Sequence, residues 1–164
     1  MQYVEIAQGT PSNRGRLIPK NELFQYIDLN NTLYRSAYVY NEEAVEFAKS
    51  NGHTLKNYYG ERSIDKVLID IDKQDNTDEH TLNLARSIVY DLEELGCAHN
   101  SMQAYFSGSG YHIVLSNDIF EFATSNDLPY IVKNTMKKLF PHADYMVYIR
   151  TALYRVQHTL NQKT

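Results

Sequence analysis

The stretch KVLIDID, residues 66–72, decides how the fold of this chain is interpreted. Its β-branched, apolar run stops at acidic residues, a pattern typical of a buried strand that delivers side chains at its end. Because side chains alternate along a strand, Asp70 and Asp72 share one face. A D-x-D pair placed there can bridge two cations, as two-metal phosphoryl transfer requires. Aspartates that serve only solubility at an exposed strand end are the alternative explanation of the motif.

Helical and strand patterns follow this stretch along the chain. A capping-box pattern at Asn76 and Glu79 precedes apolar residues at helical spacing, which predicts a helix that ends near Gly96. Strand patterns at 103–106 and 111–115 flank the small-residue turn SGSG, which is a hairpin signal.

The outer parts of the chain add further elements. NEEAVEFAK, residues 41–49, predicts a short helix, and a longer one is expected over 128–140, with Asp127 as its cap. MVYIR and ALYRV, residues 146–150 and 152–156, predict a strand, a turn and a strand. The fold class is therefore α+β: a mixed or antiparallel sheet with flanking helices, on the plan of RNA-recognition-like folds. We expect one domain, residues 1–164, with a small N-terminal α/β lobe (1–65) and a catalytic core (66–164).

Composition and charge limit the class of protein. The 164 residues carry a net charge of −4, which counts against a protein that coats nucleic acid but not against an enzyme whose carboxylates surround metal ions. The single cysteine, Cys97, excludes an internal disulfide and a multi-cysteine zinc site. No apolar run approaches the roughly 18 residues of a membrane span, and the start of the sequence lacks an export leader. We therefore expect a cytoplasmic protein without membrane contact.

The turn FSGSGYHI, residues 106–113, is the second element that carries chemistry. Its glycines let backbone amides and the Ser107 and Ser109 hydroxyls approach an anion closely. The imidazole of His112, at the start of the next strand, can donate to a phosphate oxygen. An ordinary Ser-Gly hairpin turn followed by a structural histidine is the alternative.

Three motifs in this order resemble the signatures of the archaeo-eukaryotic primase superfamily. The D-x-D strand and SGSGYH match the first two. The third is an aspartate after a small residue, followed by an R-L-P-G-S-L-H-x-K-T-G type segment; here Ala143-Asp144 precedes RVQHTLNQKT, residues 155–164. Gln157-His158 stands where Pro-Gly is usual, and Asn161 where histidine is usual. The resemblance spans about residues 66–164.

The resemblance implies a role for each matching residue. Asp70, Asp72 and Asp144 would hold two Mg²⁺ or Mn²⁺ ions in a DNA primase or primase-polymerase of phage or plasmid type. The incoming triphosphate would contact residues of the second and third motifs: Ser107, Ser109, His112, Arg155 and Lys163. The implied partners are a single-stranded DNA template, NTP or dNTP, and a fused or separate helicase or accessory domain. Because the match stops just before the expected glycine, we expect a C-terminally truncated chain, located in the host cytoplasm if a phage encodes it.

Other functions fit parts of the same pattern. An end-joining repair polymerase would use the same three signatures on an existing end. A metal-dependent nuclease would use the aspartates without a triphosphate site, and a non-catalytic RNA-recognition-like module would expose aromatics on its central strands. A contact of Tyr34, Arg35 and Tyr38 with nucleotide or template is the less favoured interpretation of these residues. Asp65, Asp75 and Asp78 are expected to be solvated loop residues.

Overall fold

Residues 66–72 form the predicted strand, and it lies in a three-stranded antiparallel sheet. The computed structural model describes residues 1–157, 159 and 160. In this part, β4 (Lys66–Asp72) pairs with β6 (Gly110–Ser116), and β6 pairs with β5 (Met102–Phe106). The predicted hairpin is confirmed, with Gly108 at a φ of 107° in its turn. Glycine adopts this left-handed conformation without the steric cost that other residues meet.

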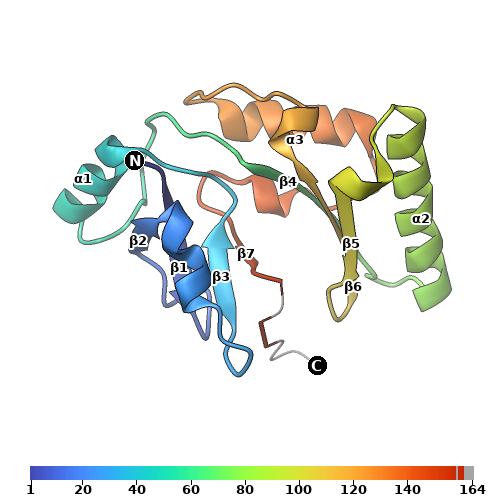
Figure 1. Ribbon diagram of the computed structural model, residues 1–164, viewed down its shortest axis with the longest axis horizontal. Coiled ribbons are helices and arrows are strands. Elements are labelled where there is room, and N and C mark those ends of the chain that lie inside the picture. Colours follow the sequence, from blue (N-terminus) through green and yellow to red (C-terminus); the bar gives the residue numbers. More distant parts are fainter. Residues whose placement is uncertain (158, 161–164) are drawn as a thin grey trace.

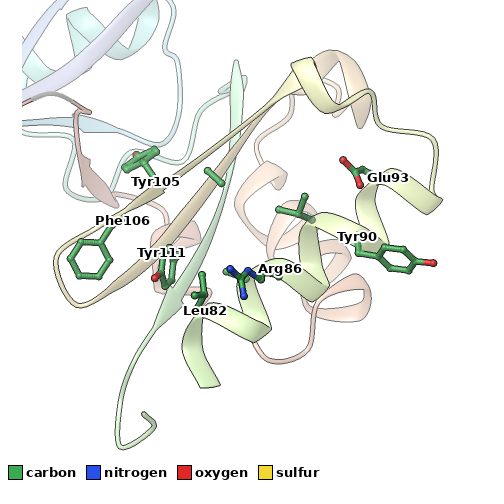
Figure 2. Close-up of a pocket in the computed structure, with 10 residues that line it drawn as sticks. Leu82, Arg86, Tyr90, Glu93, Tyr105, Phe106 and Tyr111 are labelled. Carbon is green, nitrogen blue, oxygen red and sulfur yellow. The ribbon is translucent and has the colours of Figure 1, made fainter. Parts of the chain in front are cut away.

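One face of this sheet is packed against helices. The face that carries Val67, Ile69 and Ile71 is buried, and α2 (Asp78–Glu94) contacts β4 and β6 there. A groove of about 340 Å³ remains between α2 and β5, and apolar and aromatic side chains dominate its wall (Figure 2). α3 (Leu128–Leu139) adds its own buried side chains to the same core. The aspartates of β4 lie on the other face, where the sequence predicts chemistry.

A second antiparallel sheet lies beside the first (Figure 1). Its strand order is β2-β1-β3-β7, with β1 (Tyr3–Gln8), β2 (Arg16–Pro19), β3 (Leu33–Ser36) and β7 (Leu153–Arg155). The last strand thus returns from the C-terminal part of the chain to the N-terminal sheet. A small core lies under this sheet: Val4, Ile6, Ile18, Leu33 and Val39.

The remaining elements test the predicted boundaries. α1 (Glu42–Ser50) begins after Asn41, whose side chain accepts from the Ala44 N–H, as a cap should. The side chain that caps α2 belongs to Thr77, one residue later than predicted. Short 3₁₀ helices complete the fold: Lys20–Tyr26, His99–Ser101, Asn117–Ile119 and Met146–Tyr148. The predicted α+β class is confirmed.

The predicted strand over 146–150 is wrong, and its tyrosine explains why. Residues Met146–Tyr148 form a 3₁₀ helix beside the open edge of β4. The Tyr148 hydroxyl accepts from the Leu68 N–H at 2.9 Å and donates to the Leu68 carbonyl at 2.6 Å. One side chain therefore satisfies the backbone groups that a neighbouring strand would otherwise have paired.

None of the described helices is long and apolar enough to cross a bilayer.

Candidate active site

Three carboxylates converge at the end of β4. Asp70 and Asp72 share a face of this strand, and Asp144 lies in the loop after α3. One carboxylate oxygen from each of the three lies within 4.8 Å of the other two. The structure thus brings together residues that are far apart in sequence, as the three-motif pattern predicts.

Backbone contacts hold Asp144 in this position. Its N–H donates to the Asp70 carbonyl at 2.7 Å, which makes an isolated bridge to β4. The Met146 N–H donates to Asp144 Oδ1 at 2.8 Å. Two residues further on, Tyr148 clamps Leu68 as described, and burial raises the pKa of its hydroxyl, which keeps the donor proton in place. The loop is therefore fixed to the strand on both sides of the carboxylate.

The electrostatics of the cluster favour a cation. Among the described residues, Asp70 Oδ1 is buried without a hydrogen-bond partner. His112 Nε2 lies 3.2 Å from this oxygen, within ion-pair distance but outside hydrogen-bond geometry. A buried oxygen that lacks a donor is costly, and neighbouring carboxylates repel one another. Oxygen ligands are those that Mg²⁺ and Mn²⁺ prefer, so the three side chains could hold a divalent ion.

His112 lies directly beside the carboxylates. It is opposite Asp70 in the β4–β6 register and only 9% exposed. On its other side, Nδ1 shares a hydrogen bond of 3.3 Å with the Tyr105 hydroxyl. Burial raises the pKa of Tyr105 to about 12, so this hydroxyl stays protonated at neutral pH. The imidazole is thus oriented between a neutral phenol and an ionisable carboxylate.

Tyr105 was not among the residues that the sequence indicated. The predicted hairpin contains the signal for it, because residues directly opposite each other in an antiparallel pair share a face. The register pairs Tyr105 with His112 and His112 with Asp70. These three therefore form one row across the sheet.

The hairpin turn meets β7 from the other sheet. Arg155 Nη2 donates to the Ser107 carbonyl at 2.7 Å, so the turn and the third motif are in contact.

Gly110 is required for the close packing of the turn on β4, because a Cβ there would lie 2.0 Å from the Ile71 carbonyl oxygen. Ser109 lines a separate cavity of about 260 Å³ with Lys73 and residues of α2. Lys163 lies outside the described residues.

The expectation of a solvated Asp65 is wrong, and Arg35 and Tyr38 are buried and not available for a nucleotide or template. Arg35 is 5% exposed and forms a bidentate pair with Asp65, with Nη2 at 2.9 Å from Oδ1 and Nη1 at 3.2 Å from Oδ2. Asp65 is therefore a half-buried ion-pair partner and not a solvated loop residue. Tyr38 is fully buried, and its hydroxyl donates to the Tyr148 carbonyl at 3.1 Å. These side chains belong to the junction between the two sheets.

Comparisons with known proteins add nothing to the description of the site. No family model, no curated protein and no solved structure matches the chain.

Proposed function

We propose that this chain catalyses template-dependent nucleotidyl transfer on single-stranded DNA, as a primase or primase-polymerase with the plan of the archaeo-eukaryotic primase superfamily. The observation that carries the proposal is the cluster of Asp70, Asp72 and Asp144 with His112 beside it. Acidic clusters alone are common on protein surfaces. A cluster that includes a buried carboxylate oxygen without a hydrogen-bond partner and adjoins a histidine on a glycine-rich hairpin is much more specific.

The carboxylates would hold Mg²⁺ or Mn²⁺, which lowers the pKa of an attacking 3′-hydroxyl and neutralises the triphosphate. The protein's own part is to position these charges. Asp144 is fixed to β4 by its backbone, so its carboxylate need not reorganise when a cation binds. Asp72 is the most exposed of the three, which leaves the cluster open on its side.

The nucleotide would bind where the hairpin meets β7. His112, oriented by Tyr105, would donate to a phosphate oxygen of the nucleotide. Arg155 already contacts the Ser107 carbonyl and places positive charge at the turn. Ser109, Lys163 and the accessory partners stay part of the proposal on the resemblance alone.

The arrangement of the sheet argues against a non-catalytic RNA-recognition-like module. Such a module stacks bases on aromatic side chains of its central strands. Here the central strand β6 presents Gly110, His112 and Val114 on the face of the aspartates. His112, the aromatic side chain among them, is 9% exposed and lies between Tyr105 and Asp70, so its ring is not open for a base to stack on. A sheet that carries carboxylates on this face in place of exposed aromatics fits a polymerase better.

The test is incorporation of labelled nucleotides on single-stranded DNA with Mg²⁺ or Mn²⁺, with and without a primer. We expect product that depends on the metal and is lost in Asp70→Asn. Product without primer identifies a primase, whereas product only with primer identifies an extending enzyme of the end-joining type. Cleavage of the template without incorporation would identify a nuclease and overturn the proposal.

A further inference from the structure

A further cavity, of about 430 Å³, has three cationic side chains in its lining: Arg14, Lys56 and Arg150. It lies among the β1–β2 loop, the segment after α1 and the segment before β7. This volume is in the range of small-ligand sites. None of these residues belongs to the three motifs, so the cavity is distinct from the carboxylate cluster.

The wall that carries Lys56 is fixed before any ligand binds. Asn51 Nδ2 donates to the Thr54 and Lys56 carbonyls at 3.2 and 2.9 Å, and Leu55 between them is buried. Gly15 packs so closely on this segment that a Cβ would lie 2.3 Å from the His53 carbonyl oxygen. A preformed wall reduces the conformational entropy that binding costs.

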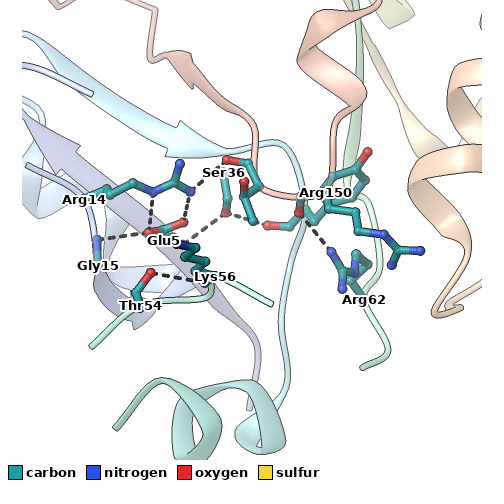
Figure 3. A network of polar contacts seen from close by, with 10 residues as sticks. Glu5, Arg14, Gly15, Ser36, Thr54, Lys56, Arg62 and Arg150 are labelled. Carbon is teal, nitrogen blue, oxygen red and sulfur yellow. Dashed lines mark hydrogen bonds and ion pairs between the residues drawn. The ribbon is translucent and has the colours of Figure 1, made fainter. Parts of the chain in front are cut away.

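The positive charge in the cavity is only partly neutralised. Arg14 is paired with the buried Glu5, and Arg150 Nη2 lies 3.8 Å from Asp127 Oδ1. Among the described residues, the Lys56 ammonium has no carboxylate within ion-pair distance. Figure 3 shows Arg14, Lys56 and Arg150 with the hydrogen bonds that surround Glu5 and Arg62.

Behind the cavity lies a fourth cation that has no carboxylate partner in the described part of the chain. Arg62 is 1% exposed, and its guanidinium donates to the carbonyls of Tyr58 and Arg150, each at 2.9 Å. Burial lowers its pKa, and the nearby Arg150 lowers it further. An anion in the cavity would compensate this charge through the wall.

An exposed aromatic ring stands at the same cavity. Tyr59 is 61% exposed, and the Arg150 guanidinium lies 4.9 Å from its ring centroid on one side. Cations interleaved with an exposed aromatic are the combination that binds single-stranded nucleic acid, with phosphates on the charges and a base on the ring.

We propose that this cavity is a metal-independent site for single-stranded DNA, in which Lys56, Arg14 and Arg150 bind a backbone phosphate and Tyr59 stacks on a base. The inference rests on the proposed function for the choice of a nucleic-acid strand as the source of the phosphate. The cavity would be a second DNA-binding site, separate from the carboxylates.

The test is binding of a labelled oligothymidylate in EDTA, measured by fluorescence anisotropy at several salt concentrations. Lys56→Glu should lower the affinity about tenfold and reduce the slope of log affinity against log salt by about 0.7, the value for one lost phosphate contact. Tyr59→Ala should lower the affinity about fivefold or more. Matched controls on exposed positions of α3, Lys138→Glu and Tyr130→Ala, should bind within about twofold of wild type.

Two further readouts separate the outcomes. Nucleotide affinity with Mn²⁺, and incorporation at saturating template, should be the same in Lys56→Glu and wild type. Equal oligonucleotide affinities in the cavity and control variants, or no binding in EDTA, would overturn the second site while Asp70-dependent incorporation still supported the polymerase. A loss of nucleotide affinity without a loss of oligonucleotide affinity would make the cavity a free-nucleotide site and also overturn the proposal.

Discussion

Each of the two sheets carries a carboxylate on a buried strand, and the two differ in how their oxygens are satisfied. Glu5 on β1 is fully buried, and its oxygens accept from Arg14 Nε and Nη2 and from the Gly15 N–H. Asp70 on β4 has a buried oxygen without a hydrogen-bond partner and two further carboxylates nearby. The first arrangement stabilises the fold as it stands, whereas the second could accept a cation.

The buried guanidinium groups of Arg35 and Arg62 show the same contrast between a charge paired with a carboxylate and one that, in the described residues, is not. Arg35 is neutralised by Asp65, which Lys20 also contacts, and the Arg35 and Lys20 charges hold the pKa of that carboxyl below its usual value although burial opposes them. Arg62 is surrounded by carbonyls and tyrosine rings instead. A paired charge marks the junction of the sheets. The two places where we propose that ligands bind are marked by the Asp70 oxygen without a hydrogen-bond partner and by Arg62, which has no carboxylate partner in the described residues.

The strongest test of the comparison removes the charge of Asp70. Asp70→Asn should lower nucleotide incorporation by at least about 10³-fold, the upper range for loss of one electrostatic group at an active site. Its free energy of unfolding should stay equal or rise, because the change relieves repulsion among the carboxylates. Incorporation assays and urea unfolding check the two parts. A variant that unfolds would show that Asp70 has the structural role we assign to Glu5.

The matched change in the other sheet is Glu5→Gln, which should lower stability and leave incorporation nearly unchanged. Loss of charged hydrogen bonds to Arg14 should lower the free energy of unfolding by about 2–3 kcal/mol. Incorporation per folded molecule should stay within about twofold of wild type. Urea unfolding at neutral pH measures the first effect. Unchanged stability together with lost activity would contradict the division between the two sheets.

A third change sharpens the assignment of His112. His112→Ala should weaken nucleotide binding by about 1.5–3 kcal/mol, the usual range for a hydrogen bond to a charged group, and raise the nucleotide KM. DNA binding should change little. Nucleotide titrations at fixed Mg²⁺ compare the variant with wild type, and equal affinities would remove His112 from the site.

The smallest effect is expected at Tyr105. Tyr105→Phe removes the hydroxyl that contacts His112 Nδ1 but keeps the ring that packs edge-on against the imidazole. Nucleotide affinity should fall by about 0.5–1.5 kcal/mol, the net value of a neutral hydrogen bond. The double variant with His112→Ala should be no weaker than His112→Ala alone. Additive losses would show that Tyr105 acts independently of His112.

The sequence predicts those parts of the structure that depend on interactions between residues close together in the chain. The β4 strand and the β5–β6 hairpin follow from local patterns, and both are confirmed with their boundaries nearly intact. The 3₁₀ helix at 146–148 was missed because one hydroxyl, Tyr148, replaces a strand, and no local pattern encodes that contact. The pairing of β7 with β3 likewise joins segments more than a hundred residues apart.

The candidate site shows the same limit. The shared face of Asp70 and Asp72 follows from strand periodicity, whereas the position of Asp144 was expected only through the resemblance. The burial of Arg35 could not be foreseen, because its partner Asp65 lies 30 residues away in sequence. Tyr105 follows from the hairpin register once the turn is known. Ion pairs between residues of different elements are thus what a single sequence does not predict.

The most direct test of the metal centre is calorimetric titration of Mn²⁺ into wild type, Asp144→Asn and the control Asp91→Asn, an exposed position on α2. Asp144 is chosen because only the fold brings it to β4. We expect wild type and Asp91→Asn to bind Mn²⁺ alike, and Asp144→Asn to bind at least about tenfold more weakly, since it loses one charged ligand. Equal binding by all three proteins, or no binding by wild type, would contradict the assignment of Asp70, Asp72 and Asp144 as a metal centre.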